Sequence, residues 1–310
     1  MSAALDLWRF DAIGTTWEIV TAAPLATAVR DDIRATIDAF DRAWSRFRPD
    51  SLVSDLSRSG STPAPADAGA MLDAFEALAD ATGGAVNPLV GASLDALGYD
   101  AAYTLRDRGV RAAPAEWRDL LTWHDGVLAL ASPAIIDVGA LGKGRLVDLV
   151  LDVVAAAVPG DAVVDAGGDL AVRGGPHRIG LEHPFDPRRA IGVWEVQDAA
   201  LCASATNRRS WPSATGGTLH HVLDARTGRP VRTYAATWAV AADAMTADAV
   251  ATALFFDGGP RLASEWGVEW VRMTTDGRVE WSPGCRAELF VAVEGGTRTA
   301  PSSRPNSLEQ

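Results

Sequence analysis

The sequence predicts a single domain of the α+β class, and three observations support this class. Of its 310 residues, 48% are apolar, which is enough to bury a core in one large domain or in two closely packed lobes. Segments with helical spacing of apolar residues and segments with the alternation of strands both occur along the chain. No internal repeat and no break in composition marks a linker between domains.

The first half of the chain is predicted to hold a strand region and three helices. Apolar residues at Val29, Ile33, Ile37, Phe40 and Trp44 follow the helical repeat. The expected elements are, in order, a strand or hairpin edge over 8–22, a helix over 25–47, a short helix led by Ser51 over 51–59, a loop over 60–68, and a helix over 69–81 that ends at Gly83-Gly84. Residues 100–120 are polar and are expected at the periphery.

The second half is predicted to be richer in strands. The expected elements are a strand over 127–131, a helix from about 143 to 158 stopped by Pro159-Gly160, a strand–turn–strand unit over 163–173, several strands up to about 240, a helix over 245–256, and strands over 268–274, 278–281 and 286–293. Residues 295–310 are rich in Ser, Pro, Thr and Arg, so a disordered tail is expected there and a folded domain over 1–294.

The net charge of −12 and the pI near 4.8 narrow the classes of partner. Sequence-independent binding of nucleic acid depends on lysine and arginine, and anionic lipid would repel this chain, so neither partner is expected. A phosphate ligand would need a metal, a helix N-terminus or a few focused cations. The opening residues show no signal-peptide pattern, and no run of 18 apolar residues occurs, which together predict a cytoplasmic protein without a membrane span. Cys202 and Cys285 are predicted to be buried thiols.

The segment from Asp137 to Gly144 contains three glycines and a lysine where a loop leads into a predicted helix. Small residues let the backbone approach a ligand closely, and the N–H groups of a helix N-terminus favour anions. Lys143 in the first turn opposes the helix dipole, which indicates a ligand. The alternative is a tight loop with an exposed lysine.

A second segment places Asp248 and Thr252 four residues apart in a predicted helix. That spacing brings both side chains to one face, where a carboxylate and a hydroxyl suit Mg²⁺. Alternatively, Asp248 serves the helix dipole and Thr252 bonds to the backbone.

A third segment, His220 to Pro230, contains two of the five histidines and ends in a turn. A histidine beside a strand end could act as a general base, or the segment could be a solvated hairpin. The paired glycines of 165–169 indicate a turn or a close approach of ligand. Segments 44–51 and 82–88 could wrap a flat heterocycle or could belong to core and loop. Neither a GxGxxG nor a GxxxxGK[ST] motif is present.

The order of these segments resembles the ApbE family of FAD:protein FMN transferases. The matching motifs are 13–17 (IGTTW), 45–51 (SRFRPDS), 83–88 (GGAVNP), 137–144 with Asp148, 167–169 (GGD), 221–224 (HVLD) with Thr227-Gly228, and 247–252 (ADAVAT). They cover roughly residues 10–260. The resemblance implies a single domain of two packed α/β lobes with a flavin cleft between them, and a Mg²⁺-dependent transfer of FMN from FAD to a Thr or Ser hydroxyl of an acceptor protein with release of AMP.

The resemblance also implies roles for individual residues. Asp248, Thr252 and the carbonyl of Ala140 would bind Mg²⁺. Residues expected to line the FAD site are Ile13, Phe47, Ala85, Val86, Asn87, Asp137 and Lys143. His221 would lie near the reacting phosphate and is the expected general base, with a metal-bound hydroxide as the alternative.

The chain departs from the family pattern in three places: Asn87 replaces an aspartate, the segment Ala203-Ser204-Ala205 replaces Thr-Ser-Gly, and Ala140 replaces a glycine. Two other activities therefore remain open: an FAD pyrophosphatase that releases FMN and AMP, and a non-catalytic FAD-binding protein.

Overall fold

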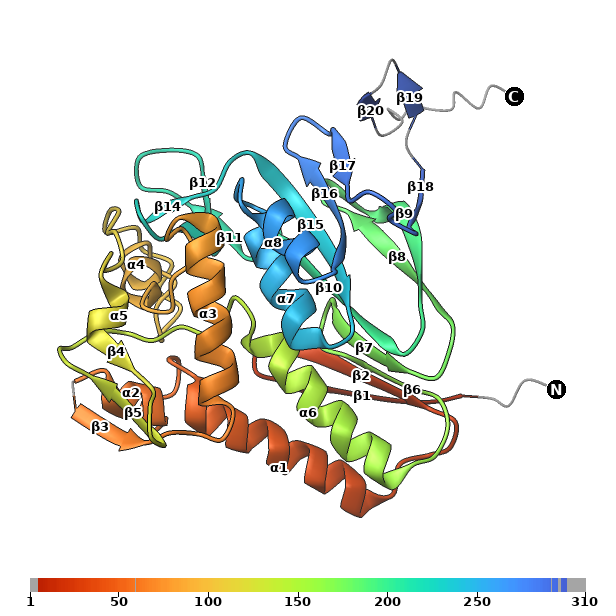
Figure 1. The fold of residues 1–310 in the computed structure, drawn as a ribbon, viewed down its shortest axis with the longest axis horizontal. Helices are drawn as coiled ribbons and strands as arrows, with labels where there is room; N and C mark the ends of the chain where they lie inside the picture. Colours follow the sequence, from red (N-terminus) through yellow and green to blue (C-terminus); the bar gives the residue numbers. More distant parts are fainter. Residues whose placement is uncertain (1–4, 59, 291, 295–296, 300–310) are drawn as a thin grey trace.

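A computed structural model describes residues 5–58, 60–290, 292–294 and 297–299. Its centre is an antiparallel eight-stranded sheet (Figure 1). The strands, in spatial order, are β1 (Asp6–Ala12), β2 (Thr15–Thr21), β6 (Ala162–Asp165), β7 (Asp169–Arg173), β10 (Ala199–Ala205), β15 (Tyr234–Ala241), β16 (Glu269–Thr274) and β17 (Val279–Trp281). The α+β class is confirmed, since the strands pair antiparallel and the helices gather on one side.

The helices of the described residues are α1 (Thr27–Trp44), α2 (Leu52–Leu56), α3 (Ala68–Thr82), α4 (Gly91–Ala96), α5 (Trp117–Leu120), α6 (Gly142–Ala157), α7 (Ala244–Ala253) and α8 (Gly259–Glu265). Apolar residues of α1, α6 and α7, such as Ile33, Val150 and Val250, share one core with Ile19 and Val164 of the large sheet. This core forms because each helix buries a stripe of apolar residues.

The opposite face of the large sheet is covered by a second sheet. This sheet has the strand order β18 (Glu288–Leu289), β9 (Asp186–Val196), β8 (His177–His183). Its Leu181, Ile191 and Trp194 pack with Leu170 and Trp238 of the large sheet. The molecule therefore has three layers on this side: helices, large sheet and small sheet (Figure 1).

A second part of the fold surrounds α3. It contains the sheet β3 (Gly60–Pro63), β5 (Val127–Leu130), β4 (Leu121–Thr122) and the short helices α2, α4 and α5. Met71 and Phe75 of α3 share a core with Leu128 of this sheet and with Ala249 of α7. The described chain also has three two-stranded sheets: β11 (Ser210–Pro212) with β12 (Thr218–His220), β13 (Leu223–Asp224) with β14 (Arg229–Pro230), and β19 (Ala292–Glu294) with β20 (Thr297–Thr299).

Most predicted elements are present, with four corrections. Residues 60–63, expected as loop, pair with β5 as β3. The segment 100–120 is less peripheral than expected, because Trp117 of α5 is buried. Helices α4, α5 and α8 were not predicted, since elements of four to seven residues are too short to show a helical repeat. The strand expected over 286–293 is divided into β18 and β19. The tail expected over 295–310 lies outside the described residues except for β20. None of the described helices is long and apolar enough to cross a membrane.

The approach of α6 to α7 depends on Gly144. A Cβ atom at this position would lie 2.1 Å from the carbonyl oxygen of Ala244 and 2.7 Å from Cβ of Asp248. The backbone N–H groups of Ala244 and Met245 also donate to the carboxylate of Asp148 at 2.7 and 2.9 Å. The N-terminus of α7 is therefore held directly against α6.

We expect Gly144→Ala to lower the free energy of unfolding by about 2 kcal/mol, because the added methyl must push α7 away. Gly69→Ala is the control: Gly69 lies in α3, and its Cβ would meet no described atom within 4 Å beyond its chain neighbours and the backbone of its own helix. That change should stabilise the protein by about 0.5 kcal/mol. Urea titrations of both variants test this, and equal midpoints would contradict the close approach.

Candidate functional site

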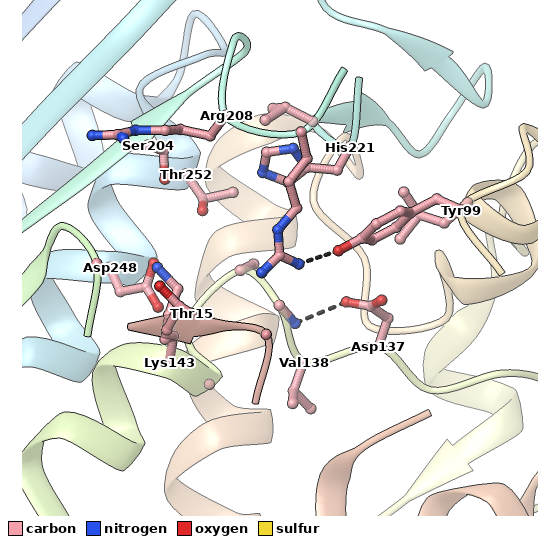
Figure 2. Close-up of a pocket in the computed structure, with 18 of the residues that line it drawn as sticks. Thr15, Tyr99, Asp137, Val138, Lys143, Ser204, Arg208, His221, Asp248 and Thr252 are labelled. Carbon is pink, nitrogen blue, oxygen red and sulfur yellow. Dashed lines mark hydrogen bonds between the residues drawn. The ribbon is translucent and has the colours of Figure 1, made fainter. Parts of the chain in front are cut away.

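A cavity of about 840 Å³ opens between the large sheet and the part of the fold around α3. This volume lies within the range of small-molecule sites. Every residue predicted from the sequence to bind metal or cofactor lines it: Ile13, Phe47, Ala85, Val86, Asn87, Asp137, Ala140, Lys143, His221, Asp248 and Thr252. Figure 2 shows Asp137, Lys143, His221, Asp248 and Thr252 around one space. The fold thus brings together residues that are distributed over most of the chain.

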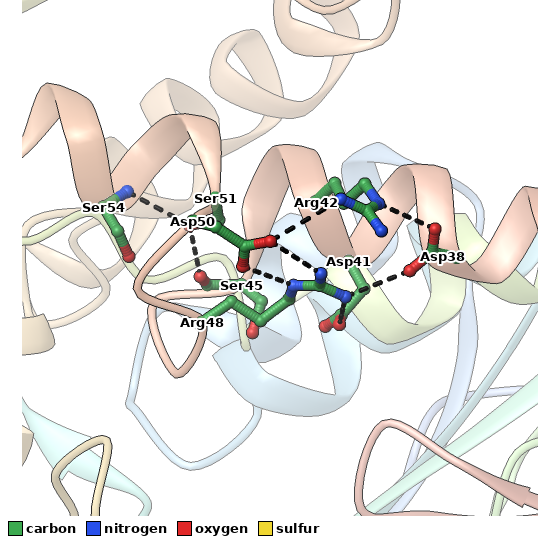
Figure 3. Close-up of polar contacts among 8 residues, drawn as sticks. All are labelled: Asp38, Asp41, Arg42, Ser45, Arg48, Asp50, Ser51 and Ser54. Carbon is green, nitrogen blue, oxygen red and sulfur yellow. Dashed lines mark hydrogen bonds and ion pairs between the residues drawn. The ribbon is translucent and has the colours of Figure 1, made fainter.

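The loop after α1 carries Arg46 and Phe47 into this cavity and is fixed by polar contacts (Figure 3). Arg48 pairs with Asp38, Asp41 and Asp50 at 3.0 Å each. Ser51 donates to the carbonyl of Ser45 at 2.6 Å and accepts from the Ser54 N–H at 3.2 Å, as its predicted capping role requires. These contacts tie the loop to α1 at one end and to α2 at the other.

Arg46 lies at the centre of a buried polar group on one side of the cavity. Its guanidinium donates to Asp137 at 2.5 Å, to Asp95 at 2.8 Å and to the carbonyl of Tyr99 at 2.9 Å. Asp137 in turn accepts from the Gly139 N–H at 2.8 Å (Figure 2). Arg46 therefore orients Asp137 and the glycine-containing loop that follows.

Aromatic side chains form the neighbouring wall. The ring of Phe47 stacks on Tyr103 with centroids 5.1 Å apart and meets the edge of Tyr99 at 5.4 Å. Tyr99 also stacks on Trp211 at 5.6 Å. Such a wall suits a planar ring system. The sequence reasoning missed Tyr99 and Tyr103, because they lie in or beside a polar segment without periodicity.

Asn87 shapes the cavity through hydrogen bonds from its side chain to backbone groups of other residues. Its amide donates to the carbonyl of Pro114 at 2.8 Å and accepts from the Leu89 N–H at 2.8 Å. The carbonyl of Ala85 accepts from the Ala225 N–H at 2.9 Å. The Ala85–Asn87 turn is therefore tied to the segments on both sides.

Asp248 and Thr252 face the cavity from one side of α7, as their spacing predicts (Figure 2). One carboxylate oxygen of the buried Asp248 accepts from the Gly144 N–H at 2.9 Å. Burial, and then the charge of Asp169, raise the pKa of Asp248 to about 8. Ala140 lies on the loop before α6 and lines the same cavity.

Lys143, predicted as an exposed or ligand-binding lysine, pairs with the buried carboxylate of Asp169. Asp169 is the last residue of the predicted 165–169 turn. Position 167 of the same turn requires glycine, because its φ is +72° and a Cβ atom there would lie 2.1 Å from the hydroxyl oxygen of Thr15. The β6–β7 turn thus contributes an acidic partner that was not among the site residues predicted from the sequence.

His221 projects into the cavity from the segment after β12 (Figure 2). Burial, followed by the charges of Arg209 and His220, lowers its pKa to about 3. Its Nδ1 atom is buried without a hydrogen-bond partner among the described residues. The ring is therefore neutral at pH 7, and its Nδ1 atom is not engaged by any other described residue.

The family model described as "ApbE family" matches residues 13–271. This range runs from the β1–β2 turn into β16, and it includes α1 to α8 and every residue of the predicted site that lines the cavity. The chain belongs to the ApbE family.

Relatives and solved structures agree with this membership. The chain is 29% identical to the FAD:protein FMN transferase of Rhodobacter capsulatus, over 93% of this chain and 58% of the relative. It is 26% identical to that of Treponema pallidum, over 83% and 80%. The crystal structure of the ApbE protein of Thermotoga maritima has the same fold, with a TM-score of 0.76, 22% identity, and coverage of 90% of this chain and 97% of that one. The flavin transferase ApbE of Vibrio cholerae gives a TM-score of 0.76 at 21% identity over 90% and 97%. This ApbE chain thus spans just over half the length of the Rhodobacter relative.

Proposed function

We propose that this ApbE chain is a Mg²⁺-dependent FAD:protein FMN transferase. It would move FMN from FAD to a Thr or Ser hydroxyl of an acceptor protein and release AMP. The observation that carries the proposal is the cavity of about 840 Å³, in which an aromatic wall, a carboxylate–hydroxyl pair and a glycine-lined loop meet. Relatives that match 83% and 93% of this chain are named for the same activity.

The donor set fits Mg²⁺. Asp248 offers one carboxylate oxygen beyond the one bonded to Gly144, Thr252 offers a hydroxyl from the next turn of α7, and Ala140 offers a carbonyl. The described residues contain no group of three or more His, Cys, Asp or Glu side chains placed for a metal. Mg²⁺ needs few protein oxygens, because water and ligand phosphates complete its coordination. When bound, it would neutralise charge on the diphosphate.

The residues of the chain would then bind and orient the reactants. The rings of Phe47 and Tyr103 would support the flavin, while Lys143 and the N-terminus of α6 would lie by the phosphates. The acceptor oxygen would bond to the flavin-side phosphorus as the bond from that phosphorus to the bridging oxygen breaks, and AMP would leave with that oxygen. His221, which lines the cavity, would take the proton of the acceptor hydroxyl, as the family resemblance implies. The free thiols of Cys202 and Cys285 support the cytoplasm as the compartment.

Incubation of the purified protein with FAD tests this proposal. With MgCl₂ and a cell extract as the source of acceptor, we expect AMP together with a protein band that keeps flavin fluorescence after denaturation. EDTA should abolish both signals. AMP and free FMN without an acceptor would indicate a pyrophosphatase instead. FAD that binds and stays intact under all conditions would indicate a non-catalytic flavin-binding protein.

A further inference from the structure

Arg209 differs from the other cations that line the cavity. Arg46, Arg48 and Arg208 each have a carboxylate oxygen at 3.0 Å or closer, and Lys143 pairs with Asp169. Arg209 also lines the cavity, but among the described residues it has no carboxylate within ion-pair distance. The charge of Arg209 is therefore available to an anionic ligand in this cavity.

The position of the Arg209 guanidinium is defined at both ends. Its Nη1 donates to the hydroxyl of Tyr99, the contact drawn as the dashed line that ends at Tyr99 in Figure 2. Its Nη2 lies 3.7 Å from the place where a Cβ atom of Gly14 would be. Tyr99 and Gly14 both line the cavity, so the guanidinium lies across it between the aromatic wall and the β1–β2 turn.

Tyr99 is a rigid and uncharged support for this guanidinium. It is buried and stacks on Trp211, whose indole N–H donates to the carbonyl of Leu97 at 2.8 Å. Burial raises the pKa of the Tyr99 phenol and outweighs the opposing charge of Arg209, so the hydroxyl stays protonated. The hydroxyl therefore positions Arg209 without neutralising its charge, and Nη2 and Nε remain available.

We propose that Arg209 binds the diphosphate of FAD, a step that rests on the proposed function. A guanidinium presents parallel N–H groups that match phosphate oxygens, and it is strongest when held in place before the ligand arrives. The diphosphate would supply the anionic partner that the described part of the protein does not provide. Arg209 is thus a substrate-binding residue, and Tyr99 positions it.

Arg209→Met tests this proposal with two ligands that differ in phosphate. Dissociation constants for FAD and for riboflavin, which lacks phosphate, would be measured by quenching of flavin fluorescence in EDTA. We expect Arg209→Met to weaken FAD binding about 10- to 100-fold, because a hydrogen bond to a charged group changes a binding constant by about this factor. The dissociation constant for riboflavin should stay within about twofold of its value in the unmodified protein. Arg188→Met is the matched control, because Arg188 is 89% exposed and does not line the cavity; it should change neither constant.

Tyr99→Phe provides a second variant that keeps the stacked ring and removes only the hydroxyl. It should weaken FAD binding about threefold to tenfold with riboflavin unchanged, and it tests the proposal even if Arg209→Met does not fold. Unchanged affinity for FAD in the folded Arg209→Met protein would overturn the role of Arg209. An equal loss of affinity for FAD and riboflavin would do the same, and both outcomes would leave the proposed function standing. Failure of the unmodified protein to bind FAD would overturn the proposed function and this inference together.

Discussion

Asp248→Asn is expected to lower the rate of Mg²⁺-dependent AMP release from FAD by about a thousandfold. The amide keeps the volume of the carboxylate and can still accept from the Gly144 N–H, so α6 and α7 should stay in contact. What is lost is the only carboxylate in the proposed metal site, and charge stabilisation by a metal contributes several kcal/mol, of which about 4 kcal/mol corresponds to a thousandfold in rate. The measurement is initial AMP release as a function of MgCl₂ concentration.

Asp152→Asn provides the matched control for this prediction. Asp152 lies on the exposed side of α6, outside the cavity, and its change removes the same charge from the chain. Its rate and its dependence on MgCl₂ should equal those of the unmodified protein. Wild-type turnover in the Asp248→Asn variant would show that the metal site has been placed wrongly.

Arg46→Met is expected to lower the free energy of unfolding by about 3 kcal/mol, because it leaves Asp95 and Asp137 without their shared cation inside the protein. Burial raises the pKa of Asp95 even with Arg46 beside it, so the charged carboxylate is already disfavoured by its loss of contact with water. The variant should also bind FAD weakly, because the Asp137 loop and Phe47 both depend on Arg46.

Urea titration and flavin binding measure these two effects. The control is Arg261→Met, which removes a similar 2.7 Å ion pair with Glu265 on the surface of α8. Exposed pairs contribute little, so its unfolding free energy should change by less than about 0.5 kcal/mol. If both variants lose the same stability, the burial of Arg46 has no energetic consequence and this interpretation fails.

Local sequence patterns determined the long elements of this protein. The helical repeat from Val29 to Trp44 predicted α1, the glycine pair at 83–84 marked the end of α3, and the serine at position 51 predicted the cap of α2. The spacing of Asp248 and Thr252 placed both on one face of α7. Each of these features depends on residues that are close together in the sequence, and such local preferences can be predicted from the sequence alone.

The tertiary structure alone decided which charges remain without partners. Arg46, Arg48 and Arg209 lie in or near similar polar segments and look alike in the sequence, yet Arg46 is neutralised by residues 49 and 91 positions away and Arg209 by none of the described carboxylates. The same holds for Gly144, whose missing side chain matters only because Ala244 lies against it. Long-range neighbours are set by how the sheet and helices pack, and no short window of sequence contains that information.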